Sequence, residues 1–208
     1  MDSRRIRVLM LLTIGLIEWP AILRAEEAEP ANPQVRAELL KMVKVDQEAR
    51  RRWARSKNAG EELLKIAEEI DKPHTRRLKE IVDKYGWPGK SLVGRDGSSA
   101  AWLLVQHAGR DEMEFLERVL ALMKRGAASG DVALHDVAYL GDRIAMYQNK
   151  PQQYGTQYTE GPDGVMVRHP IEDEAQVDER RAAAGLPSMA EQEKLMSKFY
   201  GKPVRKSR

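Results

Sequence analysis

Apolar residues recur three or four positions apart along most of this chain, with charged residues between them, which is the pattern of amphipathic helices. The first such stripe begins after Asn32 and Pro33, a cap followed by a first-turn proline, and continues to about Lys57. The same spacing predicts further helices over residues 63–70, 71–85, 100–108, 111–126, 134–148, 173–184 and 188–199. Most of the chain is therefore expected to be helical.

The pattern becomes strand-like after Pro151. Residues 154–158 alternate in character, a Pro-Asp-Gly turn lies within 161–164, and residues 165–167 can return as a partner strand. A two-stranded hairpin is not stable alone, so it must lie on the helices.

Residues 86–97 contain four glycines and a proline, which predicts an irregular loop. Ser98 or Ser99 can then cap the helix that follows. We therefore expect a mainly α fold, a single-domain, bundle-like helical array with one small β-hairpin near the C-terminal third.

Residues 1–25 differ from the rest of the chain. Arginines at positions 4, 5 and 7 precede the apolar run 8–17, and small residues allow cleavage after Ala25. This pattern predicts a secretory signal peptide. The apolar run is about half the roughly 20 residues that a membrane-spanning helix needs. We expect an exported protein, periplasmic or secreted, with no stable membrane span after cleavage.

The remaining chain divides into a connector (26–32), a single helical domain (33–200) and a basic tail (201–208). The formal net charge of the full chain is +3, and residues 1–25 hold four basic and two acidic residues, so the rest carries +1. With no clustered basic face, no nucleic-acid partner is expected. With no cysteine, disulfides, thiol nucleophiles and thiolate metal sites are excluded.

The common catalytic motifs are absent from the sequence. It has no serine-hydrolase elbow, Walker loop, dinucleotide-binding glycine fingerprint, zinc-protease helix or EF-hand loop. The four histidines, at positions 74, 107, 135 and 169, show no helical ligand spacing. No metal site is therefore expected, and the sequence indicates no particular cofactor.

His107 is the strongest candidate for acid–base chemistry, because it lies in an apolar helical segment beside Gln106. Trp102 shares a helix face with Gln106, since the two are four positions apart. The alternative is a histidine at a helix end, bonded to a carbonyl or to solvent.

A second candidate group lies on the helix 134–148, where Tyr139 and Asp142 share one stripe and Arg143 lies at its edge. Asp142 and Arg143 could hold a substrate carboxylate or orient His107. They could equally form a structural ion pair that bridges to the hairpin.

Five blocks, taken in order, resemble a bacterial family, domain of unknown function 6624. They are YGWPGKSLVG (85–94), AAWLLVQHA (100–108), AYLGDR (138–143), KPQQYGTQY (150–158), and PIED followed by VDERRAAAGLP (170–187). The similar region spans roughly 78–187. The resemblance implies a shared site, without roles, at Trp87, Trp102, Gln106, His107, Tyr139, Asp142, Arg143, Gln153, Tyr154, Gly155, Thr156 and Gln157.

Two functional hypotheses follow. In the first, the domain binds a small polar or peptide-like ligand in a pocket formed by the QHA helix, the YLxDR helix and the YGTQ strand. Its enzymatic version is hydrolytic, with His107 as base and Arg143 or the glutamines at a developing oxyanion. In the second, a non-enzymatic structural or interaction domain uses the same residues as a buried polar staple. The ligand, the reaction and the oligomeric state stay open.

Overall fold

The computed structural model describes residues 29–56, 58–161, 165–201 and 203–206. The predicted signal peptide, the first three residues of the predicted connector and the Pro-Asp-Gly turn lie outside these ranges. The described chain forms two compact units, one ending at Val132 and one beginning at Ala133. Both are rich in helix, and a small sheet lies in the second, as expected for a mainly α fold.

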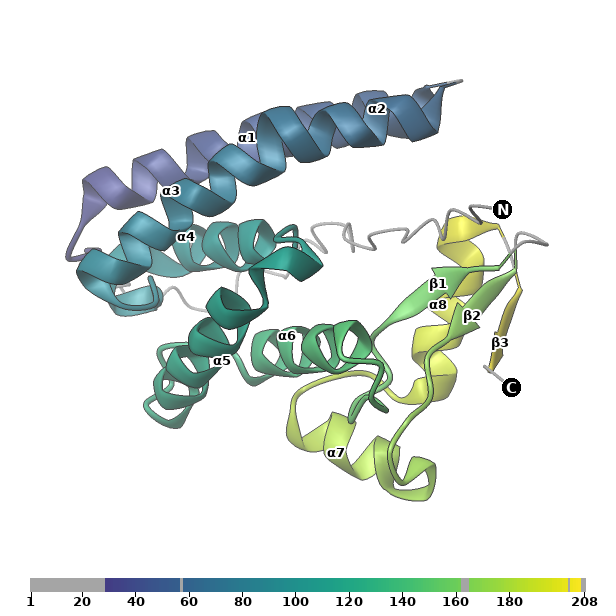
Figure 1. Cartoon of the computed structure of the whole chain (residues 1–208). Helices are drawn as coiled ribbons and strands as arrows, with labels where there is room; N and C mark the ends of the chain where they lie inside the picture. Colours follow the sequence, from purple (N-terminus) through teal and green to yellow (C-terminus); the bar gives the residue numbers. More distant parts are fainter. Residues whose placement is uncertain (1–28, 57, 162–164, 202, 207–208) are drawn as a thin grey trace. The chain divides into compact units, whose positions relative to one another are not determined.

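The first unit is helical throughout (Figure 1). Its elements are α1 (Pro33–Arg55), α2 (Ala59–Ile66), the π-helical turn η1 (Ala67–Asp71), α3 (Lys72–Tyr85), α4 (Lys90–Val105), the short 3-10 turn η2 (Arg110–Glu112) and α5 (Met113–Ala128).

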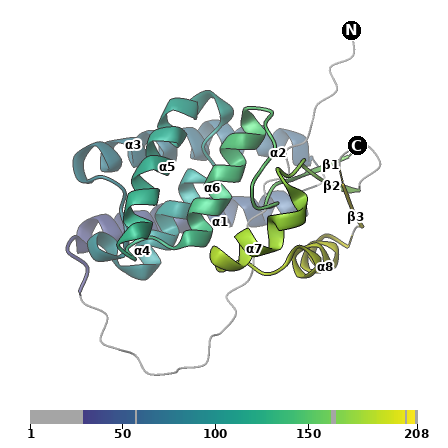
Figure 2. The same cartoon turned by 90° about the horizontal axis from the view of Figure 1, so that it is seen from below.

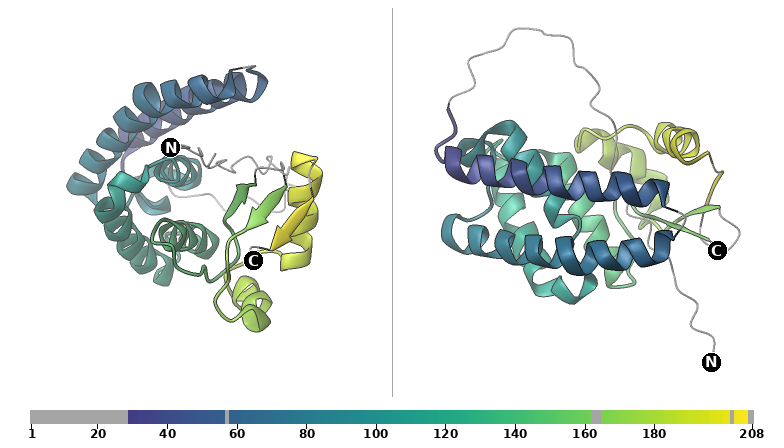
Figure 3. Two further views of the ribbon diagram at one scale, coloured as in Figure 1. Left: turned by 45° about the vertical axis from the view of Figure 1, so that its right-hand side comes forward. Right: turned by 90° about the horizontal axis from the view of Figure 1, so that it is seen from above.

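Helix α1 begins where the sequence predicts. The side chain of Asn32 accepts a hydrogen bond from the backbone N–H of Val35 at 3.0 Å, and Pro33 occupies the first turn. The apolar stripe of α1 is buried, and the helix packs along α4. Helices α1 and α3 run side by side (Figure 3), joined at their surface by an ion pair of 2.6 Å between Arg77 and Glu38.

The prediction for residues 86–97 is wrong in part. Helix α4 begins at Lys90 and continues through a kink at Gly94, where φ is +73°, so Ser98 lies buried inside the helix and does not cap it. The dihedrals of Gly94 are not helical, so α4 consists of two helical segments on either side of this glycine, and the element packs against α1. Helix α4 ends at Val105, which places His107 in the turn that follows.

The second unit combines helices with a small sheet (Figure 2). Its elements are α6 (Leu134–Tyr147), β1 (Tyr158–Glu160), β2 (Met166–Arg168), the 3-10 turn η3 (Glu174–Gln176), α7 (Val177–Ala183), α8 (Met189–Tyr200) and β3 (Val204–Lys206). Strands β1 and β2 are antiparallel, with Tyr158 opposite Arg168, and β3 pairs with β2 in parallel.

The sheet differs from the predicted hairpin in two ways. The first strand begins at Tyr158, so the YGTQ segment is a loop and not a strand. The described residues also add a third strand, taken from the predicted basic tail. Met196 of α8 packs with Tyr158, Met166 and the partly buried Val204, which explains how so small a sheet is stabilised.

No helix in the described ranges has both the length and the apolar character needed to cross a lipid bilayer.

Candidate functional site

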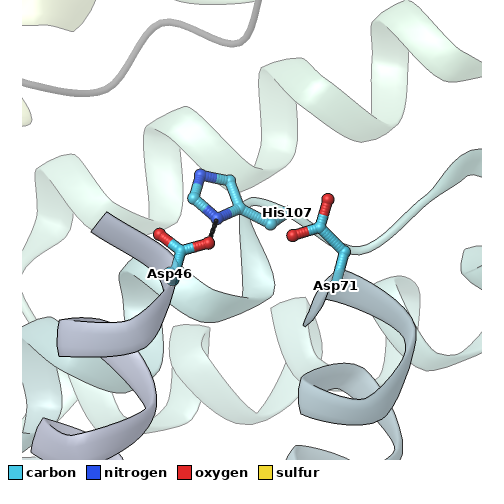
Figure 4. Close-up of side chains that lie close together, drawn as sticks. All are labelled: Asp46, Asp71 and His107. Carbon is cyan, nitrogen blue, oxygen red and sulfur yellow. Dashed lines mark hydrogen bonds and ion pairs between the residues drawn. The ribbon is translucent and has the colours of Figure 1, made fainter. Parts of the chain in front are cut away.

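A buried polar cluster joins three elements of the first unit. Asp46 and Arg50 lie four residues apart on α1, Asp71 is the last residue of η1, and His107 follows α4. Figure 4 shows the carboxylates of Asp46 and Asp71 on either side of the His107 side chain. A π-helical turn inside a helix is rare and is frequently found at functional sites, and here it carries Asp71 into the cluster.

The four side chains form a continuous set of bonds. Nδ1 of His107 lies 2.8 Å from Oδ1 of Asp46. Arg50 donates from Nε to the same carboxylate oxygen at 3.0 Å and from Nη2 to Oδ1 of Asp71 at 2.6 Å. The side chains of Asp46 and His107 are 1% and 2% exposed, whereas those of Arg50 and Asp71 are 12% and 15% exposed. The cluster is therefore closed at Asp46 and reaches solvent at Arg50 and Asp71.

The short contact to Asp46 fixes the tautomer of His107. An ionised carboxylate oxygen can only accept a hydrogen bond, so Nδ1 carries the hydrogen at a separation of 2.8 Å. Nε of Arg50, which lies 3.1 Å from Nδ1, then donates to Asp46. Nε2, the other ring nitrogen, is buried.

The two carboxyl groups have pKa values displaced in opposite directions. Burial raises the pKa of Asp71 to about 6, with the charge of Asp46 adding to the rise and that of Arg50 opposing it. Burial also acts to raise the pKa of Asp46, but the hydrogen bond from His107 and the charges of His107 and Arg50 bring it below its usual value. Two carboxyls with diverging pKa values are typical of acid–base sites.

A second histidine lies within electrostatic reach of the cluster. Burial lowers the pKa of His74, the charge of Asp46 opposes this change, and that of Arg50 reinforces it. Nδ1 of His74 is buried and has no hydrogen-bond partner among the described residues.

The same cluster contains a possible set of metal ligands. Asp46, Asp71 and His107 each offer one ligand atom, and these atoms lie within 4.8 Å of one another. Arg50 lies close to all three residues, with its Nε 3.0 Å from Asp46 and 3.1 Å from His107 and its Nη2 2.6 Å from Asp71, so one positive charge already lies beside these atoms.

The second unit holds a separate polar cluster around Asp142 of α6. Its carboxylate accepts hydrogen bonds from the backbone N–H groups of Gln153 (2.8 Å), Tyr154 (3.1 Å) and Thr156 (3.0 Å), and from the Thr156 hydroxyl (3.0 Å). Burial raises the pKa of Asp142, and the backbone donors oppose that rise. Asp142 thus binds the YGTQ loop to α6.

Other polar groups also form hydrogen bonds with this loop. The Gln152 side chain donates to the carbonyl of His169 at 2.9 Å and accepts from the N–H of Gln157 at 2.8 Å. The Gln157 side chain donates to the Thr156 hydroxyl at 3.0 Å. Arg181, whose side chain is fully buried, donates to the carbonyl of Tyr154. The loop's amides and hydroxyls are therefore engaged mainly within the unit.

The residues named by sequence analysis are distributed over both units. In the first unit, Trp87, Gln106 and His107 are buried and Trp102 is half-buried. In the second, the buried residues are Asp142, Arg143, Thr156 and Gln157, the half-buried ones are Tyr139 and Tyr154, and Gln153 is exposed. Asp46 is the carboxylate that bonds to His107, and Asp142 bonds to the loop.

Sequence reasoning missed Asp46, Arg50 and Asp71. One signal was available for the first of these. Asp46 lies four residues after Met42 and three before Ala49, inside the buried stripe of α1. A carboxylate at an apolar stripe position requires a buried partner. No comparable local signal marks Asp71.

Comparison with known proteins identifies a family for this chain. A family model described as "Family of unknown function (DUF6624)" matches residues 33–205, a range that includes both polar clusters. No curated protein and no solved structure matches the chain.

Proposed function

Because the chain belongs to DUF6624, a family of unknown function, we propose a function from its geometry. The helical unit binds a small polar or peptide-like ligand at the cluster of Asp46, Arg50, Asp71 and His107, and His107 transfers a proton to or from that ligand. We also propose that the protein is exported, on the basis of the signal-like pattern in residues 1–25.

The observation that carries this proposal is the bond of 2.8 Å between Nδ1 of His107 and Asp46. A carboxylate that holds one ring nitrogen fixes the tautomer and stabilises the imidazolium that forms when the other nitrogen takes a proton. We propose that Nε2 of His107, which is buried in the structure, is the general base.

The cost of burying the cluster also favours a functional role. Two carboxylates, a guanidinium and an imidazole lose their hydration here, and apolar residues of similar volume usually stabilise a core as well or better. Arg50 and Asp71 keep 12% and 15% of their side-chain surface exposed, which gives a ligand an approach from that side. In a hydrolytic version, His107 takes a proton from water, and Arg50 stabilises the negative charge that develops.

A polar staple is the second candidate role, and a specific observation favours it for the second unit. Asp142 accepts from the backbone N–H groups of Tyr154 and Thr156 in the YGTQ loop and from that of Gln153 just before it, which is how a buried carboxylate fixes a loop. The pocket predicted from the QHA, YLxDR and YGTQ segments draws on both units, and it stays a prediction.

The proposed function is tested by a thermal-shift screen of dipeptides, their amides and acetylated amino acids against the full chain. His107→Gln removes the base, and Asp46→Asn removes the acceptor that fixes the tautomer. His135→Gln is the matched control, because the side chain of His135 is 51% exposed and lies outside the cluster.

At least one compound should raise the Tm of the parent and of His135→Gln, and fail to raise that of folded His107→Gln. The proposal is contradicted when no compound shifts the parent, or when the shift is equal in His107→Gln. Far-UV circular dichroism of each variant checks that it is folded. Should His107→Gln not fold, Asp46→Asn supplies the same comparison.

A further inference from the structure

An apolar groove lies on the seam between α1 and α4 of the first unit. Its volume is about 550 Å³, which is within the range of pockets that hold small ligands. Its apolar lining comes from both helices and consists of Leu40, Val43, Ala100 and Leu103. Leu40 is 36% exposed, and Val43 and Leu103 are half-buried. Large apolar side chains are therefore open to solvent along this seam.

The groove and the cluster of Asp46, Arg50, Asp71 and His107 follow the same seam. At one end, Arg36 of α1 pairs with Asp96 of α4 at 2.6 Å. Further along both helices, Asp46 meets His107 at 2.8 Å. The two helices thus run in the same direction, and the groove lies between these two contacts.

One end of the groove lies a single helical turn from the cluster. Val43 is three positions before Asp46 on α1, and Leu103 is four positions before His107, which comes just past the end of α4. Side chains three or four positions apart are neighbours on one face of a helix. An extended ligand can therefore contact the groove and the cluster together.

We propose that the ligand of this site is an N-acylated amino acid or peptide, whose acyl chain lies in the groove and whose amide group lies at the cluster. This inference rests on the proposed function and deepens it, because it names the ligand class of the same site. An acyl chain matches the apolar lining. Arg50 and Asp71, which are 12% and 15% exposed, offer a donor and an acceptor, and an amide group carries one of each.

The far end of the groove sets the length of the acyl chain. Arg36 and Asp96 lie there and satisfy each other through two hydrogen bonds of 2.8 and 2.6 Å, so this end requires no charged group from a ligand. Residues 36–43 span about 10 Å along the axis of α1, which an extended acyl chain of about eight carbons matches.

Burial of the acyl chain supplies affinity. A methylene group that is fully removed from water tightens binding about fourfold, and half of that free energy, for a groove that stays open to solvent, gives about twofold. N-octanoylglycine has six methylenes more than N-acetylglycine, with the same amide and the same charge. We therefore expect the octanoyl compound to bind about fiftyfold more tightly.

The test is a titration of the full chain with N-acetylglycine and with N-octanoylglycine, followed by NMR so that weak binding is measured. Leu40→Glu places a carboxylate in the groove, and it should reduce the fiftyfold gain to less than about fivefold. Leu64→Glu is the matched control, because Leu64 is 61% exposed on α2 and does not line the groove. It should keep the full gain, and both variants should bind N-acetylglycine as the parent does.

Ser99→Phe is the second variant, should Leu40→Glu not fold. Ser99 is an exposed residue of the lining, and a phenyl ring at this position fills the groove, so the gain should again be lost. The inference is overturned when the parent binds N-octanoylglycine no more tightly than N-acetylglycine, or when the groove variants keep the gain of the parent.

The same titrations separate this inference from the proposed function. His107→Gln should weaken the binding of both compounds. When N-acetylglycine binds in a His107-dependent way without any gain from the longer chain, the acyl-chain inference fails and the proposed function stands. When Leu40→Glu removes the gain and folded His107→Gln binds both compounds as the parent does, the groove is supported and the role of His107 is refuted.

Discussion

Asp142→Ala should loosen the YGTQ loop, because it removes the acceptor that binds this loop to α6. The backbone N–H groups of Gln153, Tyr154 and Thr156 donate to the carboxylate at 2.8–3.1 Å, and so does the Thr156 hydroxyl at 3.0 Å. Alanine leaves these donors without their acceptor, and it also opens a small cavity.

The magnitude follows from the number of donors and their burial. A buried donor left unsatisfied costs about 1–3 kcal/mol. Asp142 and Thr156 are 1% and 3% exposed, so water does not easily replace the lost acceptor there, whereas the exposed Gln153 can turn its amide to solvent. We expect a loss of about 3–4 kcal/mol in the free energy of unfolding, near the sum of the smallest such costs.

The assay combines hydrogen exchange at single amides with urea unfolding followed by circular dichroism. In the parent, the amides of Gln153, Tyr154 and Thr156 should exchange slowly, since each donates to one carboxylate. In Asp142→Ala they should exchange faster. The amides of α1 are the internal control, because α1 belongs to the other unit.

Asp142→Asn is the matched variant. Asparagine keeps the volume of aspartate and one acceptor oxygen. Its NH2 group, however, is a donor placed beside backbone donors. The expected loss in the free energy of unfolding therefore lies between zero and that of Asp142→Ala. A loss below about 1 kcal/mol for Asp142→Ala, with the three amides still protected, would refute the reasoning.

Three further predictions concern pH, a glycine and a helix cap. Because the pKa of Asp71 is about 6 in the folded chain against an ordinary 3.8, the folded state holds this proton more tightly, and the free energy of unfolding should fall by on the order of 2 kcal/mol as pH rises from about 4 to 6. Urea unfolding across that range should show this fall, and its persistence in Asp71→Asn would contradict the assignment. Gly155→Ala should lower Tm, because φ is +70° and the new Cβ would lie 2.6 Å from Sδ of Met189, whereas Gly60→Ala, in open space on α2, should raise it slightly. The reverse order of the two Tm values counts against this backbone geometry. Ser188→Ala should cost about 1 kcal/mol in urea unfolding through loss of the capping box of α8, and an unchanged midpoint would show that the cap is not formed in solution.

Local rules explain what could be predicted from sequence. The period of apolar residues placed α1, α3 and α6 within a few residues of their observed ends. The helix caps also depend on residues close in sequence. The side chain of Asn32 accepts a hydrogen bond from an amide three residues away, and Ser188 forms a capping box with Glu191. A helix is stabilised by neighbours within about four positions, so its signals stay visible in a single sequence.

Backbone positions with particular partners were predicted less well. The YGTQ segment has the alternation of a strand, but Gly155 takes a positive φ and Asp142 accepts the N–H groups that a strand would offer to a neighbour. Residues 204–206 pair with β2 in parallel across a long separation, which no local pattern indicates.

The sequence by itself determined the helices of this protein and the residues that begin and end several of them. The tertiary structure alone decided that His107 meets Asp46, Arg50 and Asp71, and that Asp142 holds a loop. The physical reason is the range of the interactions. Helix formation depends on adjacent turns, whereas a buried charge cluster depends on how α1, η1 and the end of α4 pack, with partners up to 61 residues apart.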